Sequence, residues 1–88
     1  MNDKAMEEFS KLPRRKQKQL LHKKLVENER RLYHRMKANP EDQAAQWMWQ
    51  YAYLSLLYEN PCFNESPEFC RDFGLPAPHT PEWYQIYH

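Results

Sequence analysis

The chain has 88 residues, enough for one small domain that buries about two-thirds of its unfolded surface, with little room for a deep catalytic cleft. Hydrophobic residues make up 41% and charged residues 28%, a composition typical of a globular protein and not of a disordered one. No run of about 18 apolar residues occurs, and the first residues lack the apolar core of a secretory signal. We therefore expect no membrane span and a cytoplasmic location.

Helices account for most of the chain. We predict a short helix over residues 3–10, a long one over 13–38 and a third over 40–59. A fourth, over 67–73, ends at Gly74, the only glycine and a natural C-terminal cap. Residues 75–80 should be extended, because each proline disfavours helix in the residue before it, and a last turn or two covers 81–87. The prediction is an all-α fold that forms a single domain over residues 1–88.

Three of the predicted helix starts share one pattern, in which a capping side chain precedes a proline and an acid. The capping oxygen accepts hydrogen bonds from free N–H groups of the first turn, the proline has no N–H to leave unpaired, and the acid favours the positive helix end. The pattern occurs in Asn39-Pro40-Glu41, Ser66-Pro67-Glu68 and Thr80-Pro81-Glu82.

The aromatic segment 47–53 fits two periodicities. An aromatic at every second position has the period of a strand, whereas Trp47, Tyr51, Leu54 and Tyr58 would share one face of a helix. We predict the helix, because a cap precedes the segment and no partner strand is found.

The third helix should pack against the long helix. We expect Trp47, Tyr51 and Leu54 to lie against Leu25, Leu32 and Met36, which together with Leu21 form an apolar stripe of the long helix. The opposite side of the third helix carries Trp49 and Tyr53, which would need cover from the C-terminal segment or from another chain.

Charge is divided sharply along the sequence. Residues 11–37 carry eleven Lys or Arg and two acids, a local charge of +9, whereas residues 1–10 sum to −2 and residues 38–88 to −6. The long helix would span about 39 Å, more than the roughly 30 Å diameter of a compact domain of this size. Its basic N-terminal end should therefore overhang the domain or meet a second subunit.

The basic residues of this segment are the first candidate binding site. They are Arg14, Arg15, Lys16, Lys18, Lys23, Lys24, Arg30, Arg31, Arg35 and Lys37. Three explanations compete: a solvated face balanced by the acidic C-terminal half, a nucleic-acid surface that neutralises phosphates, and a docking face for an acidic protein. Charge alone does not decide between them.

Aromatic residues form the second candidate site. Tyr and Trp dominate binding hot spots, since they bury a large area at low entropic cost. The candidates are Trp49, Tyr53, Trp83, Tyr84 and Tyr87. The terminal aromatics could either fold back over Trp49 or form an exposed docking peptide.

The sequence shows no pattern of a catalytic or metal site. Cys62 and Cys70 lie eight residues apart, and they and the histidines lack the spacing of zinc ligands. The serines have no nucleophile-elbow setting, and a single glycine excludes the glycine-rich phosphate loops. We expect no catalytic residue, no metal and no cofactor.

These features favour a non-enzymatic helical interaction protein. It would bind a protein or nucleoprotein with an acidic surface through the basic helix and exposed aromatics, as an inhibitor or accessory factor of the kind that phages and plasmids encode. One alternative is a nucleic-acid-binding module that contacts phosphates with residues 11–37. Another is a structural homodimer.

Overall fold

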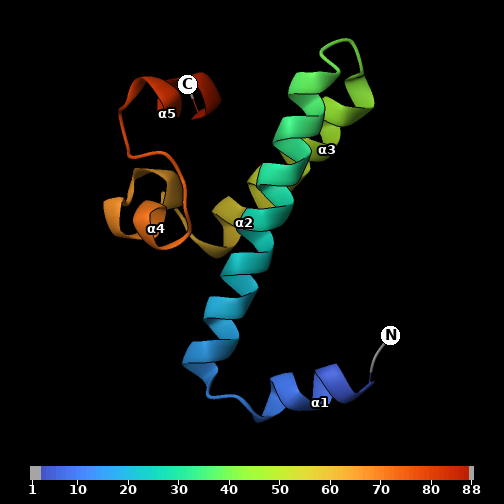
Figure 1. The fold of residues 1–88 in the computed structure, drawn as a ribbon, viewed down its shortest axis with the longest axis vertical. Helices are drawn as coiled ribbons and strands as arrows, with labels where there is room; N and C mark the ends of the chain where they lie inside the picture. The colour runs from blue at the N-terminus through green and yellow to red at the C-terminus, as the bar shows by residue number, and fades with distance from the viewer. Residues whose placement is uncertain (1–2, 88) are drawn as a thin grey trace.

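The computed structural model describes residues 3–87, and these residues form helices without any strand (Figure 1). The elements are α1 (Asp3–Lys11), α2 (Arg14–Ala38), α3 (Gln43–Glu59), the 3-10 helix η1 (Phe63–Glu65), α4 (Pro67–Asp72) and α5 (Pro81–Tyr87). The predicted all-α fold is confirmed, together with its long second helix and aromatic-rich third helix.

The helices α2 and α3 pack against each other in antiparallel orientation as the main helix pair of the fold, and η1, α4 and α5 pack beside this pair (Figure 1). The first two turns of α2 extend beyond this packed region, because no residue of α2 before His22 is buried. At that end α1 leaves α2 at a wide angle and buries none of its own residues (Figure 1). The overhang predicted for the basic end of α2 is therefore present.

The predicted cap at Asn39 is wrong. Asn39 ends α2, and its side-chain amide donates to the carbonyl of Arg35 at 3.0 Å. The side chain that caps α3 is Asp42, whose carboxylate accepts from the N–H groups of Ala44 and Ala45 at 3.0 and 3.4 Å. Consequently α3 begins at Gln43, and residues 40 and 41 lie in the connecting turn.

The other two predicted caps are confirmed. The Ser66 hydroxyl accepts from the N–H of Phe69 at 3.2 Å, with proline at the first position of α4. The Thr80 hydroxyl accepts from the N–H of Trp83 at 3.4 Å at the start of α5. In both cases a side-chain oxygen pairs an N–H that the first helical turn leaves free.

Gly74 ends α4 as predicted. Its φ of +70° is left-handed, and the N–H of Leu75 reaches back to the carbonyl of Cys70 at 2.8 Å. This is the Schellman arrangement, which turns the chain sharply so that Leu75 enters the core. The following segment is irregular over 75–77, but Pro78 and His79 form a turn, so the extended stretch is shorter than predicted.

The core lies where α2, α3 and the C-terminal elements meet. Its buried cluster consists of Val26, Leu56, Phe63, Cys70 and Leu75. The packing predicted for α3 is wrong, since Trp47, Tyr51 and Leu54 point to solvent and Ala45, Ala52 and Leu56 are buried instead. Alanine lets two helices approach closely, and the side of α3 that carries Ala45 and Ala52 therefore lies inward.

Candidate functional site

Glu29, in the middle of α2, is fully buried and links three helices. The indole N–H of Trp49 donates to its Oε1 at 2.9 Å, and the Tyr87 hydroxyl donates to the same oxygen at 3.5 Å. The Arg30 guanidinium lies 3.7 Å from Oε2, which accepts no hydrogen bond. Burial raises the pKa of the Glu29 carboxyl, against the opposing effects of the Trp49 hydrogen bond and the Arg30 charge. With no exposed surface, this carboxyl cannot reach a ligand. Its role is structural, because it links α2 to α3 and α5.

Most of the aromatic residues predicted to bind a partner are engaged inside the chain. Trp49 stacks on Tyr53 at 5.4 Å, and Tyr53 stacks on Tyr87 at 5.5 Å. Trp83 is buried and donates its indole N–H to the carbonyl of Asn64 at 2.6 Å. The C-terminal segment thus folds back and covers α3. Among the five candidates, Tyr84 is the most exposed, with its hydroxyl 3.1 Å from Nδ1 of His79.

The exposed aromatic surface lies elsewhere on α3. Trp47, Tyr51, Leu54 and Tyr58, named here the aromatic stripe, are 71, 76, 54 and 85% exposed on one helix face. Met48, 43% exposed, flanks them. The only charged residue of α3 is Glu59 at its last position, so the stripe itself is uncharged.

Two stripes with the same spacing explain why sequence reasoning missed this surface. The inward stripe of α3 runs through Ala45, Trp49, Ala52 and Leu56, and the aromatic stripe runs along the opposite side of the helix. Both have apolar residues at intervals of four, three and four, so periodicity cannot choose between them. The signal that could have decided is residue size, because the two alanines favour a closely packed helix contact.

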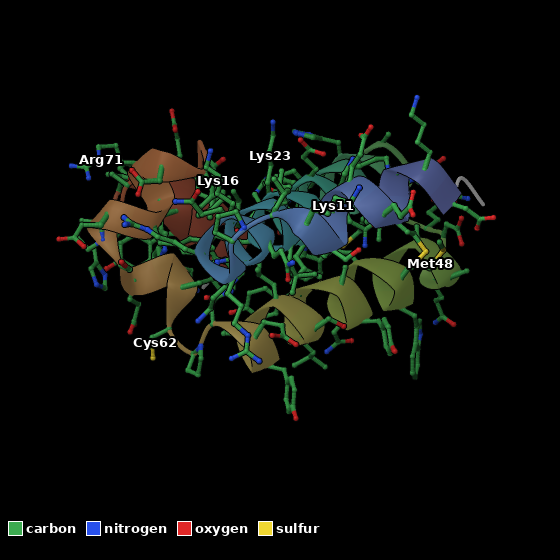
Figure 2. The ribbon with its side chains drawn as sticks, turned by 90° about the horizontal axis from the view of Figure 1, so that it is seen from below. Lys11, Lys16, Lys23, Met48, Cys62 and Arg71 are labelled. Carbon is green, nitrogen blue, oxygen red and sulfur yellow. The ribbon has the colours of Figure 1, made fainter. Side chains whose placement is uncertain are left out.

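The basic residues predicted as a site are exposed with one exception. Arg30 is half-buried, because its guanidinium lies 4.5 Å from the centre of the Tyr33 ring and beside Glu29. The nine exposed residues are Arg14, Arg15, Lys16, Lys18, Lys23, Lys24, Arg31, Arg35 and Lys37, named here the basic face. Lys16 and Lys23 lie on the side of α2 turned away from α3 (Figure 2).

The acidic half of the chain does not neutralise this face through ion pairs. Within residues 3–87, no Lys or Arg of the basic face lies within salt-bridge distance of an acid beyond residue 38. Lys24 pairs with Glu27 of its own helix at 4.0 Å, a weak pair because both side chains are more than half exposed. The charge of the basic face is therefore available to another molecule.

A groove of about 850 Å³ opens between the basic face and α4. Its apolar lining comes from Leu12, Leu20, Val26 and Phe73, and Lys16 and Lys23 flank it. Two acids also line the groove, but each lies beside a basic residue: Glu27 beside Lys24 at 4.0 Å and Asp72 beside Arg71 at 3.4 Å. The groove thus combines an apolar floor with two lysines that have no acidic partner within residues 3–87.

His22 lines the same groove with an unsatisfied nitrogen. The residue is only 9% exposed, its ring packs on Phe69 at 5.8 Å and Phe73 at 6.1 Å, and its Nε2 has no hydrogen-bond partner. Burial, followed by the charge of Lys18, lowers the pKa of His22, so the structure disfavours the protonated ring. A bound molecule could supply the missing partner, since a buried unpaired polar atom is unfavourable.

Among the residues that the structure describes, no three His, Cys, Asp or Glu side chains come together as a metal site. None of the helices within 3–87 combines the length and the apolar character that crossing a bilayer requires. No protein-family model matches the chain, and the comparisons with curated proteins and with solved structures give no match.

Proposed function

We propose that the protein is a non-enzymatic interaction protein of the cytoplasm, which binds an acidic, amphipathic helix of a partner protein in the groove between α2 and α4. The observation that carries this proposal is the composition of the groove, in which Lys16 and Lys23 stand without acidic partners above an apolar floor. Occupying the partner's surface in this way would make the protein an inhibitor or accessory factor.

The groove matches the usual way in which a helix is bound by another protein. An amphipathic helix places its apolar side chains in a hydrophobic groove and its polar side chains at the rim. Here Leu20 and Phe73 would contact the apolar face, and the two lysines would meet acidic side chains. Exposed charges of this kind raise the association rate and fix the orientation more than they add affinity.

The rest of the basic face would attract the partner from a distance. Arg31 and Arg35 are exposed along the same helix but lie outside the groove lining. Their field would act on any negatively charged molecule, including nucleic acid. The experiment must therefore separate a peptide seated in the groove from phosphates spread along α2.

A pair of charge-reversed variants makes this separation. Lys16→Glu/Lys23→Glu changes the groove, and Arg31→Glu/Arg35→Glu makes the same change in net charge outside it. The probes are a fluorescent model helix of about 18 residues, or five turns, with leucine on one face and glutamate on the other, and random double- and single-stranded DNA and RNA. Binding is measured over a salt series by fluorescence anisotropy.

We expect the groove variant to weaken peptide binding at least tenfold and the control variant to weaken it less than threefold. Leu20→Ser, which removes an apolar contact from the floor, should also weaken peptide binding and leave any nucleic-acid binding unchanged. Equal loss in both charge variants, with nucleic acid bound more tightly than peptide and a steep fall of affinity with salt, would replace this proposal with phosphate binding. No peptide binding at millimolar concentration would also overturn it.

A further inference from the structure

The aromatic stripe of α3 has no cover within residues 3–87. Four large apolar side chains in a row, each more than half exposed, form the kind of contiguous patch that marks an interaction surface. We propose that a second copy of this chain covers the stripe, so that two α3 helices pack antiparallel across a two-fold axis. This surface lies apart from the groove, and the proposal does not depend on the function proposed above.

The spacing of the stripe indicates that its occupant is a helix. Trp47, Tyr51, Leu54 and Tyr58 follow one another at intervals of four, three and four residues, the spacing of a coiled-coil seam. Such a seam faces one partner helix along its length, here over about 17 Å from Trp47 to Tyr58. The inward stripe of α3, with the same intervals, already packs against α2 in this way.

The lack of charge on the stripe favours a second copy over an acidic or basic partner. A two-fold interface brings each surface patch against itself, so a patch with charges of one sign would repel its own copy. The stripe carries none, and the helix that bears it has its single charge at Glu59. Antiparallel packing also sets the positive end of one helix dipole beside the negative end of the other.

The two-fold axis determines which residues meet. With the axis midway between Tyr51 and Leu54, Tyr51 contacts the partner's Leu54 and Trp47 contacts the partner's Tyr58. Each end of the interface then pairs an indole with a phenol, and each phenol in the middle lies on an aliphatic side chain. No two side chains of the same kind oppose each other across the axis.

The area that the stripe exposes is large enough for a dimer interface of ordinary size. The exposed fractions of the stripe and Met48 correspond to roughly 700 Å² per chain, given side chains of about 150–250 Å² each. Two copies that covered this area completely would bury about 1,400 Å², within the range of specific protein–protein interfaces. The helix α2 packs against the side of α3 that is opposite to the aromatic stripe (Figure 2). The dimer therefore leaves both basic grooves open.

Oligomeric state tests the proposal directly. Sedimentation equilibrium of the wild-type chain from about 1 µM to 1 mM should show a dimer at the higher concentrations. Tyr51→Glu places a charge in the middle of the stripe and should be monomeric over the whole range. Met6→Glu adds the same charge to another exposed apolar residue, on α1, and should dimerise like the wild type. Equal far-ultraviolet circular dichroism of the three chains shows that the variants are folded.

A monomeric wild-type chain at 1 mM would overturn the proposal, and so would an undiminished dimer of Tyr51→Glu. Disulfide trapping tests the register in a Cys62→Ser background. A mixture of Tyr51→Cys and Leu54→Cys chains should form a disulfide-linked heterodimer under mild oxidation. A faster link between two Tyr51→Cys chains would indicate parallel helices and contradict the arrangement proposed here.

Discussion

The indole N–H of Trp49 donates to the carboxylate of Glu29 at 2.9 Å, and this hydrogen bond ties α3 to an acid that the fold buries completely. Burying a carboxyl group is unfavourable unless its oxygens find donors. Trp49 supplies the shorter of the two side-chain hydrogen bonds to Oε1, and Tyr87 of α5 supplies the longer one. Through these two donors, Glu29 of α2 holds α3 and α5 in place beside it.

Trp49→Phe should therefore destabilise the protein. Phenylalanine keeps most of the stacking on Tyr53 but removes the N–H that pairs the carboxyl. Hydrogen bonds to charged groups contribute about 1.5–3 kcal/mol, so we expect a loss of about 2 kcal/mol in the free energy of unfolding. Urea denaturation monitored by circular dichroism measures this loss.

Trp47→Phe is the matched control, since Trp47 is 71% exposed and has no hydrogen bond in the described chain. At micromolar protein concentration, where a dimer contributes little, this substitution should change the free energy of unfolding by less than about 0.5 kcal/mol. Equal losses in the two variants would show that the Trp49–Glu29 hydrogen bond does not stabilise the fold.

The pH dependence of stability should also report on Glu29. Burial raises the pKa of this carboxyl above its ordinary value of 4.5, so the folded chain holds the proton more tightly than the unfolded chain. The resulting stabilisation is complete below pH 4.5 and is lost as the pH rises through the folded pKa. Relative to Glu29→Gln, which cannot ionise, the wild type should gain stability as the pH falls from 7 to 4.5.

The difference between the two chains is the quantity to measure, since His22 has the opposite effect. The pKa of His22 is lowered, so its contribution is lost as the pH falls below 6.5. That contribution is present in both chains and cancels in the comparison. A difference that stays constant between pH 7 and 4.5 would contradict a raised pKa for Glu29.

The sequence was sufficient to predict which segments form helices, but not which face of α3 packs against the rest of the fold. Capping chemistry is local, so the starts at Ser66 and Thr80 and the end at Gly74 could be predicted. Asn39 failed because it stands between two helices and its side chain can serve either one, and Asp42 is the better placed acceptor for α3.

The buried and exposed faces depend on contacts between distant segments. The sequence alone indicates that Glu29 is a surface residue of a basic helix. Its burial becomes evident only in the fold, which brings Trp49 and Tyr87 against it. The sequence alone indicates that the aromatic stripe belongs to the core. The fold shows instead that the C-terminal segment covers the opposite face of α3. The exposure of the basic face could be predicted, because nine Lys and Arg residues along one helix need no tertiary contact to be recognised.

Gly74→Ala tests the turn that directs Leu75 into the core. Nothing lies within 4 Å of the position where an added Cβ would stand, so the cost comes from the left-handed backbone alone. We expect a loss of about 1–2 kcal/mol in the free energy of unfolding, and a smaller loss for Gly74→Asn, because asparagine tolerates this conformation better. Thermal denaturation of the three chains gives the order. An alanine variant as stable as the wild type would mean that the turn relaxes to another conformation.

The stability of α1 should depend on Gln17. Its side-chain amide donates to the carbonyls of Phe9, Ser10 and Leu12 at 3.0, 3.3 and 3.0 Å, where α1 ends. A nine-residue helix without buried residues is marginal by itself, so loss of these bonds should loosen it. Gln17→Glu keeps the shape but offers no donor, and its charge faces three carbonyl oxygens. We expect faster amide hydrogen exchange over residues 3–12 and an unchanged melting temperature.

Gln19→Glu provides the comparison, since Gln19 is exposed on the same turn of α2 and makes none of these bonds. It introduces the same charge and should leave the exchange of α1 as in the wild type. If both variants accelerate exchange equally, charge near the end of α1 is the cause and not the amide of Gln17. If neither does, then α1 is held by its other contacts. Only selective loss of protection in Gln17→Glu supports the side-chain amide as the link that stabilises α1.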